Sequence, residues 1–241
     1  MKALIVHAHP EPRSFVAAMR DVAAEALGDS GYEVVVSDLY AEGFDPVAKP
    51  EDFLARADPD YLVYAKEQRH CLSADALCAD IAREFERLMS ADLLVLTFPI
   101  FWFSAPAMLK GWIDRVFLSG AIYGGRRFYD RGALAGRRAL VGAALGGREH
   151  MFGPGSVHGD LTVMLRHLLQ GTLGYAGYDV VEPFFAHHVP YVDDAARAAM
   201  LEGWRACLEN IDARPVLPMP TLDDFDDRMR PVRPAKPALT E

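Results

Sequence analysis

Short apolar runs of strand length alternate with helical segments along most of this chain. Residues 2–8, KALIVHA, form the first run, and an amphipathic segment follows at residues 15–27, with Ser14 placed to cap it. Further apolar runs occupy residues 32–40, 91–99, 137–145 and 178–188, and further helical segments occupy residues 75–89, 105–117, 161–177 and 193–211. Strands joined by helices run in the same direction, so the pattern predicts a parallel five-stranded sheet with helices on both faces.

Two stretches do not fit this alternation. Residues 41–74 are too long for a simple connection and are predicted to be rich in loops. Residues 212–241 contain six prolines and little periodicity, which predicts an extended tail. This tail is expected to pack on the body or on a dimer partner, with simple disorder as the alternative. We therefore divide the chain into one folded domain at residues 1–211 and a proline-rich C-terminal tail at residues 212–241.

The net charge of −9 argues against proteins that bind nucleic acid or an anionic membrane through a basic surface. No apolar run approaches the roughly 20 residues of a membrane span, and the apolar start is interpreted as a strand rather than a signal peptide. The cysteines Cys71, Cys78 and Cys207 are odd in number and follow no metal-binding spacing. The sequence predicts a reduced, cytoplasmic protein without nucleic-acid or membrane partners.

Ligands of an open parallel sheet bind beyond the carboxyl ends of its strands. Three loops lie there, at residues 9–14, 99–106 and 146–160, and none carries a convincing nucleophile, carboxylate pair or metal cluster. The first lacks a glycine-rich phosphate motif, but it leads into a helix N-terminus, where free N–H groups attract phosphate. His9, Arg13 and Ser14 are candidate donors to that phosphate. A capping serine beside a solvated arginine is the simpler interpretation of this loop alone.

Aromatic side chains fill the second loop. Phe101, Trp102 and Phe103 follow one another directly, so they cannot all point the same way. Core packing would explain any one of them, but a loop over a sheet edge offers no deep core for all three. Flat apolar walls with exposed backbone N–H groups suit a planar heteroaromatic ligand.

The third loop begins with Gly146 and Gly147, which allow the backbone to approach a ligand closely. His158 near its end is a candidate donor of a proton or a hydrogen bond, although a histidine at a helix start is more often a cap or surface residue. A planar cofactor between an aromatic wall and a glycine pair, with phosphate at the first helix, indicates a flavin. His187 and His188 lack a third metal ligand, so a polar loop is preferred there and no metal site is predicted.

Four stretches of the chain, KALIVHAHPEPRSF, ADLLVLTFPIFWFSAPAMLKGWIDRVF, MFGPGSVHGD and LEGWRACLENI, are similar to the NAD(P)H:quinone oxidoreductases of the DT-diaphorase type. This resemblance implies a flavodoxin-like three-layer sandwich with the strand order 2-1-3-4-5. It also implies a homodimer with its active site at the subunit interface. In the implied ping-pong cycle, bound FAD, with FMN as the alternative, passes hydride from NADH or NADPH to a quinone.

The resemblance also assigns roles to individual residues. The implied cofactor-binding residues are His9, Arg13, Ser14, Phe15, Pro99, Ile100, Phe101, Trp102, Phe103, Leu145, Gly146, Gly147, Phe152, Arg197 and Leu201. The implied substrate-binding residues are Trp102, Phe103, Tyr123, Phe128, Phe152 and His158, and the implied catalytic residues are His158, Gly146 and Gly147. Arg197 and Leu201, together with Asp114, match positions around the partner or the adenine end.

This chain departs from the family pattern in the expected pocket. Phe152 stands where the family usually has a tyrosine, so a Tyr–His relay is not available. Either His158 alone, or the amides of Gly146 and Gly147, would then stabilise the charge of reduced flavin. Gly125 replaces a second cavity tyrosine, which predicts a wider pocket.

Other activities are weighed against this interpretation. An azo-, nitro- or flavin reductase is the nearest alternative, because an open aromatic cavity discriminates poorly among flat acceptors. A flavodoxin-like electron carrier would keep the flavin without the enzyme. A phospho-receiver needs an acidic residue at the end of the third strand, where Phe98 and Pro99 stand instead. A hydrolase of the nucleophile-elbow type needs G-x-S-x-G, which the sequence lacks.

Overall fold

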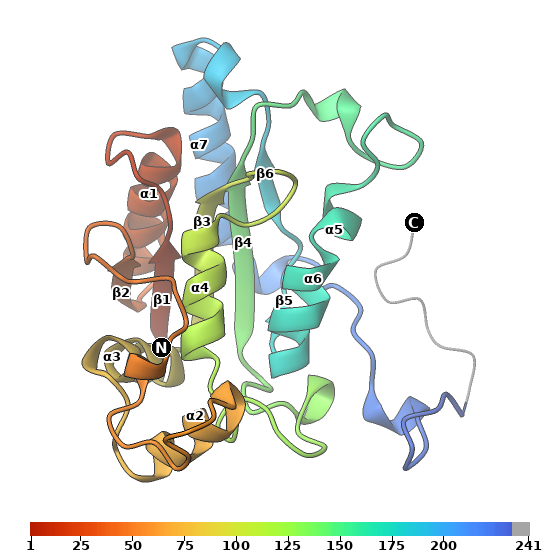
Figure 1. The fold of residues 1–241 in the computed structure, drawn as a ribbon. Helices are drawn as coiled ribbons and strands as arrows, with labels where there is room; N and C mark the ends of the chain where they lie inside the picture. Colours follow the sequence, from red (N-terminus) through yellow and green to blue (C-terminus); the bar gives the residue numbers. More distant parts are fainter. Residues whose placement is uncertain (233–241) are drawn as a thin grey trace.

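Strand β1, Lys2–His7, is the second strand from one edge of a parallel sheet in the computed structural model, which describes residues 1–232 (Figure 1). The order of the strands is β2-β1-β3-β4-β5, and β6 also pairs with β4. In this parallel register Ala3 is level with Val34 on one side and with Leu93 on the other. The remaining strands are β2 Glu33–Asp38, β3 Leu93–Pro99, β4 Arg138–Ala144, β5 Asp179–Val180 and β6 Phe184–Ala186.

The predicted fifth strand at residues 178–188 consists of two short strands. β5 pairs with the start of β4, whereas β6 pairs with its end, where Phe184 lies opposite Gly142. Between them the amide of Glu182 donates to the carbonyl of Pro215 at 2.9 Å, and Pro183 has no amide to donate. The ladder is interrupted there, so the prediction of one long strand is wrong in this detail.

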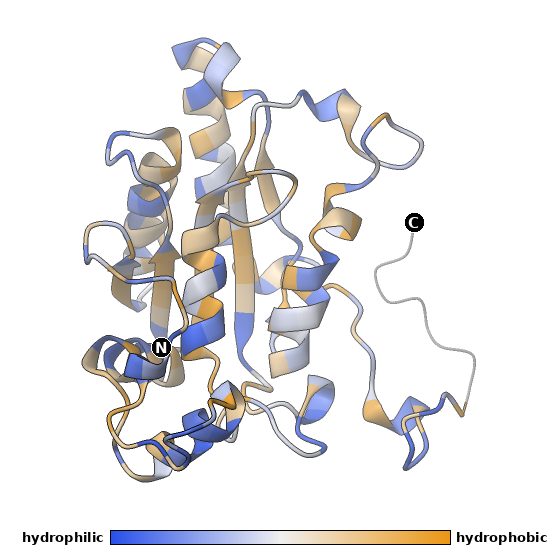
Figure 2. Ribbon diagram, in the orientation of Figure 1, coloured by the Kyte–Doolittle hydropathy of each residue, from blue (hydrophilic) through white to orange (hydrophobic). Residues whose placement is uncertain are grey.

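Helices cover both faces of the sheet, which confirms the predicted three-layer sandwich. The helices are α1 Phe15–Asp29, α2 Tyr64–Ser73, α3 Ala79–Ser90, α4 Ala107–Val116, α5 Leu161–Met164, α6 Arg166–Leu168 and α7 Asp194–Glu209. The 3-10 helices are η1 Pro50–Asp52, η2 Tyr129–Arg131, η3 Glu149–Met151, η5 Val189–Tyr191, η6 Ile211–Ala213 and η7 Leu222–Asp224, and η4 Leu169–Gly174 is a π-helix. α1 and α7 pack on one face, whereas α3, α4 and the segment from α5 to η4 pack on the other. Figure 2 shows the central strands as largely hydrophobic, in keeping with a sheet covered on both sides.

The helix predicted at residues 161–177 is broken. It leaves helical geometry at Leu165, and η4 is a π-helix, in which the hydroxyl of Thr172 donates to the carbonyl of His167 at 3.0 Å. Gly174 leaves room for the sulfur of Met219, which lies 2.4 Å from the place where a Cβ would be. The segment thus deviates from a regular helix where the C-terminal tail packs on it.

The prediction of a loop-rich segment at residues 41–74 missed helix α2. The buried side chains of this helix are those of Glu67, Gln68 and Cys71, so its inward face is polar and lacks the hydrophobic periodicity of an amphipathic helix. Gln68 accepts a hydrogen bond from the amide of Ser119 at 3.1 Å, and the carboxylate of Glu67 accepts one from the amide of Ala57 at 2.7 Å. Hydrogen bonds to buried polar groups hold this helix in place.

Residues 212–232 lie along the body of the molecule. Val216 forms an antiparallel bridge with Val181, and the amide of Leu217 donates to the carbonyl of Val180 at 2.8 Å. Leu222 is buried, and its amide donates to the carboxylate of Asp130 at 2.9 Å. This part of the tail therefore extends the edge of the sheet beside β5. Residues 233–241, the remainder of the predicted tail, lie outside the described residues.

Candidate active site

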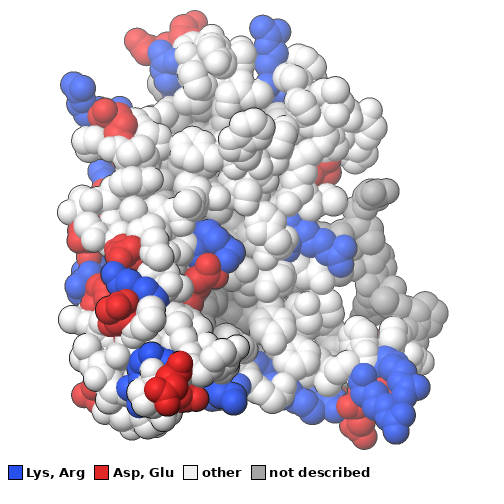
Figure 3. Space-filling view, viewed as in Figure 1, with Lys and Arg blue, Asp and Glu red and all other residues white. Residues whose placement is uncertain are grey.

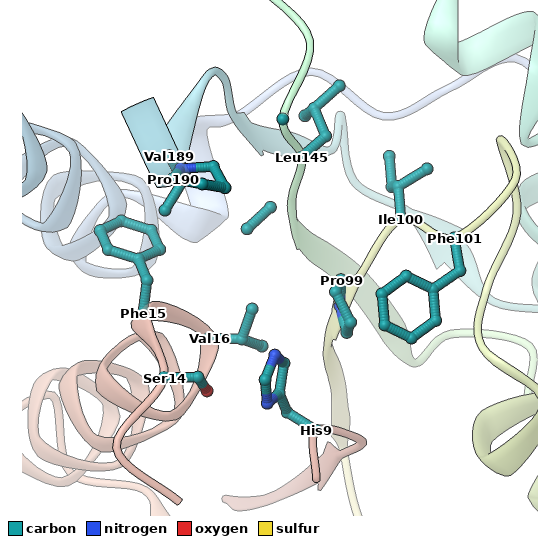
Figure 4. A pocket seen from close by; sticks show the side chains of 12 residues that line it. His9, Ser14, Phe15, Val16, Pro99, Ile100, Phe101, Leu145, Val189 and Pro190 are labelled. Atoms are coloured by element: carbon teal, nitrogen blue, oxygen red, sulfur yellow. The ribbon is translucent and has the colours of Figure 1, made fainter. Parts of the chain in front are cut away.

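The three loops at the carboxyl edge of the sheet surround one cavity of about 360 Å³ (Figure 4). The end of β1 and the start of α1 form one side, the loop after β3 forms the opposite side, and the loop after β4 closes the third side together with η5. The lining residues, in that order, are His9, Ser14, Phe15 and Val16, then Pro99, Ile100 and Phe101, then Ala144, Leu145, Gly146, Val189 and Pro190.

The start of α1 offers backbone donors to this cavity. Ser14 caps the helix as predicted, and its hydroxyl accepts a hydrogen bond from the amide of Ala17 at 3.0 Å. The amides of Phe15 and Val16 have no acceptor among the residues that the structure describes. Free amides at a helix N-terminus attract anions, phosphate in particular. The geometry therefore suits a phosphate group at this end of the cavity.

His9 and Arg13 lie differently with respect to the cavity. Nδ1 of His9 accepts a hydrogen bond from the amide of Glu11 at 3.0 Å, so the neutral ring carries its proton on Nε2. Burial lowers the pKa of His9, which favours that neutral form. The side chain of Arg13 is 91% exposed, with its Nε 3.5 Å from the carboxylate of Glu11, and it does not line the cavity.

Phe101–Ser104 form a tight hairpin turn, because the backbone groups of Phe101 and Ser104 pair in both directions at 3.0 Å. Trp102 and Phe103 occupy the central positions with φ angles of 50° and 58°. Two positive φ angles characterise a type I′ turn, in which asparagine and glycine are usual. Left-handed geometry costs other residues about 1–2 kcal/mol each.

Trp102 is 96% exposed, and Phe101 and Phe103 are each almost half exposed. Core packing therefore does not explain the three aromatic residues. The amides of Trp102 and Phe103 have no acceptor in residues 1–232. The turn presents flat side chains and unpaired donors at the mouth of the cavity.

A second cavity, of about 280 Å³, adjoins the first and shares Ile100, Leu145 and Gly146 with it. His158 lies there between two aromatic rings, with ring centroids 5.3 Å from Phe103 and 5.2 Å from Phe152. The remaining lining residues are Trp102, Phe103, Gly147, Phe152 and His158. Neither cavity has an aspartate, glutamate, lysine or arginine among its lining residues.

The glycine pair lies on the boundary of the two cavities. The amides of Gly146 and Gly147 find no acceptor within the described part of the chain. A Cβ atom on Gly147 would lie 2.6 Å from the ring of Phe152, so a larger residue there would displace that ring. Phe152 itself has no hydroxyl, and its ring packs against His158 and His187.

Tyr123 and Phe128 do not line either of these cavities. They belong to an aromatic cluster around Tyr175, with Phe128 stacked on Tyr175 at a centroid distance of 5.3 Å and Tyr123 at 6.1 Å. Tyr123 and Tyr175 line a third cavity of about 230 Å³, together with Asp114 at the end of α4. The sequence does not indicate Tyr175, because its contacts with Tyr123 and Phe128 join residues that are distant along the chain.

Arg197 and Leu201 also lie apart from the lining residues. Arg197 donates to the carbonyl of Val189 at 3.2 Å, and it pairs with Asp194 at 2.6 Å. It therefore stabilises the η5 loop without lining the cavity. Leu201 packs against the core between α7 and the sheet. Val189 and Pro190 line the cavity without having been predicted, because only the tertiary fold brings η5 to this edge.

Part of the molecular surface is free of charge. Figure 3 shows an uncharged stretch in the upper middle of this view, with charged groups around it at the top, at the sides and below. In residues 1–232, histidine, cysteine and acidic side chains do not gather into a group of three or more suited to a metal ion. No helix in the same range is long and apolar enough to cross a bilayer.

Comparison with known proteins places the chain in a family. A family model described as having a flavodoxin-like fold matches residues 1–208. NAD(P)H dehydrogenase (quinone) 1 of Cavia porcellus is 39% identical over 211 residues, which cover 87% of this chain and 77% of that protein. The chain belongs to the flavodoxin-like family of NAD(P)H:quinone oxidoreductases. The predicted family and enzyme class are thus confirmed.

Two solved structures extend this comparison. A candidate quinone reductase from Klebsiella pneumoniae has a TM-score of 0.91 and 29% identity, over 96% of this chain and 94% of that one. General stress protein 14 of Treponema denticola, solved in complex with FMN, has a TM-score of 0.60 and 25% identity, over 88% of this chain and 99% of that one.

The residues present fit the flavin that such an oxidoreductase requires. Residues whose amides have no acceptor in the described chain line the two cavities from three elements, namely the start of α1, the aromatic turn Phe101–Ser104 and the Gly146-Gly147 pair. The walls between them are apolar and carry no charge. A flat ring with polar edges and a phosphate at one end matches both the donors and the walls.

Proposed function

We propose that this protein binds one flavin per chain at the carboxyl edge of the sheet and uses it to reduce quinones with NADH or NADPH. FAD is the proposed flavin, with FMN as the alternative. The observation that carries this proposal is a largely apolar cavity, without acidic side chains, lysine or arginine, lined by residues whose backbone amides have no acceptor in the described chain. Family membership and the FMN complex of the Treponema denticola protein support it.

The proposed binding mode follows from the positions of the donors. The free amides of Phe15 and Val16 would hold phosphate, and His9, which lines the same cavity, would offer its Nε2–H as a further donor. The flavin ring would lie between the loop from Pro99 to Phe103 and the Gly146-Gly147 pair. Arg13, Arg197 and Leu201 do not line this cavity, so their part in cofactor binding stays a prediction.

Bound flavin would supply two-electron hydride transfer, first accepting from the nicotinamide and then donating to the quinone in a ping-pong cycle. The chain's own part is to position the reactants and to stabilise charge. His158 would hold a hydrogen bond or proton at the second cavity, flanked by Phe103 and Phe152. Because Phe152 cannot donate, the amides of Gly146 and Gly147 are proposed to share that role.

A homodimer is proposed because the site is open in the single chain. Phe101, Trp102 and Phe103 are exposed side by side, and such an apolar group is an unusual surface for a protein that remains monomeric. The cluster of Tyr123, Phe128 and Tyr175 would reach the flavin of the partner chain and complete its substrate cavity. The cytoplasmic location stays a prediction.

A visible absorption spectrum of the purified protein tests the proposal. A bound flavin that bleaches with NADH or NADPH under anaerobic conditions and recovers with a simple benzoquinone would support both half-reactions. Chromatography of the released cofactor distinguishes FAD from FMN. A protein that binds neither flavin, even after incubation, would refute the proposal.

The same experiment separates the alternative functions. A flavin that ignores both nicotinamide nucleotides would favour an electron carrier. Reduction by NADH followed by faster turnover with an azo dye, a nitroarene or free flavin than with quinones would favour those reductase activities.

A further inference from the structure

His188 contacts both carbonyl groups of the glycine pair. It lies between β6 and η5 with left-handed backbone angles, φ 57° and ψ 23°. Its amide donates to the carbonyl of Gly147 at 2.9 Å, and its Nδ1 lies 2.9 Å from the carbonyl oxygen of Gly146. A carbonyl oxygen accepts hydrogen bonds and cannot donate them, so Nδ1 carries the proton in this pair. One residue, outside the lining of the cavities, therefore sets the orientation of both carbonyls.

The carbonyl of Gly146 and the amide of Gly147 belong to one planar peptide group. A donor that fixes the oxygen of this group therefore also fixes the direction of its N–H. That N–H has no acceptor in residues 1–232, and Gly147 lines the second cavity. A hydrogen bond to the oxygen also polarises the group, which strengthens the N–H as a donor by about 10–30%.

The glycine pair benefits from such a support because glycine has more conformational freedom than any other residue. Tyr191 packs on His188 with ring centroids 4.9 Å apart, and its ring lies 3.5 Å from the place where a Cβ of Gly146 would be. Phe152 fills the corresponding space beside Gly147. The two rings enclose the pair, and the hydrogen bonds from His188 set the angle of its peptide group.

We propose that His188 is a positioning residue that aims and polarises the Gly147 amide toward the flavin. This inference rests on the proposed flavin site. His188 acts through the peptide group and does not itself line the cavities. Reduction adds negative charge to a flavin, and a stronger, better aimed donor stabilises added negative charge. His188 therefore favours the reduced flavin over the oxidised flavin.

The left-handed angles of His188 determine which variants give a clean test. Glycine, asparagine and aspartate adopt positive φ more readily than other residues. His188→Asn keeps an N–H donor on a short side chain, His188→Gly removes the donor without strain, and His188→Asp places a carboxylate near the Gly146 carbonyl. The two-electron midpoint potential and the dissociation constant of the flavin are measured for each variant. Thermal melting of the apoproteins controls for folding.

We expect His188→Gly to lower the affinity for reduced flavin, relative to oxidised flavin, by about fivefold to tenfold, where tenfold corresponds to about 30 mV. His188→Asn should resemble the wild type, and His188→Asp should lower the ratio further than glycine does. Equal potentials in the wild type and the glycine variant, or equal losses in the asparagine and glycine variants, would overturn the inference and leave the flavin site intact. A wild-type protein that binds no flavin would overturn both proposals.

A second measurement requires neither a variant nor a flavin. The nitrogen chemical shifts of a histidine ring show which nitrogen carries the proton in the neutral form, and the structure requires Nδ1 for His188. The wild-type apoprotein is measured at about pH 8.5, where an ordinary histidine is neutral. A proton on Nδ1 supports the inference, whereas a proton on Nε2 contradicts it even if the variants do not fold.

Discussion

Two polar regions of this molecule differ in whether their hydrogen-bonding groups have partners within the protein. In the buried Arg115 cluster, formed by Arg115, Asp52 and Asp80, the guanidinium donates to both carboxylates at 2.7 Å and to the carbonyl of Asp45 at 2.7 Å. At the carboxyl edge of the sheet, the amides of Trp102, Phe103, Gly146 and Gly147 have no acceptor in the described chain. The first region is charged and fully paired, whereas the second is uncharged and unpaired.

The difference separates groups that hold the fold from groups that serve a ligand. A buried charge is tolerated when its partners are in place, so the Arg115 cluster fastens the segment at residues 45–80 to α4. The exposed amides of this edge have only water as an acceptor in the single chain, and the two left-handed aromatic residues are strained. They are explained when a bound molecule accepts the hydrogen bonds and covers the rings.

The largest expected effect comes from breaking the Arg115 cluster. Arg115→Met leaves the buried carboxylate of Asp52 without its cation, which should lower the free energy of unfolding by about 3–5 kcal/mol in urea denaturation. Arg126→Met is the matched control, because its partner Asp227 is fully exposed, and it should change stability by less than about 0.5 kcal/mol. Similar small effects in both variants would contradict the structural role of the cluster.

At the carboxyl edge, His158→Gln should slow reduction of the flavin by NADH. The expected loss is about 10- to 100-fold, the low end of acid–base contributions, with little change in stability because the side chain is not fully buried. Stopped-flow absorbance measures the rate, and the exposed neighbour Val157→Ala is the control. An unchanged rate would show that His158 only fills the space between two aromatic rings.

His7 is fully buried, as Arg115 is, but its Nε2 has no partner among the described residues. Burial lowers the pKa of His7 to about 4, below the value of about 6.5 in an unfolded chain. The unfolded chain therefore binds more protons between these values, so the stability present above pH 6.5 is lost as the pH falls toward 4.

His7→Asn tests this acid sensitivity, because asparagine still offers a polar partner to Thr97 and does not titrate. The variant should lose about 2 kcal/mol less stability than the wild type between pH 7 and pH 5. Urea denaturation at both pH values measures this difference. The same pH dependence in the two proteins would show that His7 does not contribute to it.

The smallest expected effect on stability has the opposite sign. Trp102→Gly relieves a positive φ angle at an exposed side chain, so the apoprotein should gain about 1 kcal/mol while its affinity for flavin falls. Met229→Gly, at another positive φ angle of 58° in the tail, should gain similar stability with unchanged flavin affinity. Full flavin affinity in Trp102→Gly would disprove the placement of the flavin against the aromatic turn.

Site residues that depend on a local sequence pattern were predicted better than site residues that depend on contacts between distant segments. Ser14 as a helix cap and the glycine pair are local features, and both lie at the predicted loops. Val189 and Pro190 line the cavity because the fold brings the η5 loop, which Arg197 contacts, to this edge of the sheet. Helix α2 was not predicted because its buried face is polar and shows no hydrophobic periodicity. Its position depends on hydrogen bonds to residues far along the chain, such as Ser119.

The layered parallel fold could be predicted from the sequence, because alternating apolar strands and amphipathic helices can bury their apolar surface in few other ways. The position of the aromatic and glycine residues at the carboxyl edge could also be predicted, because strand ends can be read from local pattern. Which amides lack an acceptor could be seen only in the folded chain, since hydrogen bonding depends on neighbours distant in sequence. The left-handed turn at Trp102 and the contact of His188 with Gly146 could likewise be seen only in the folded chain. Neither backbone angles nor long-range contacts produce a periodic pattern in a sequence.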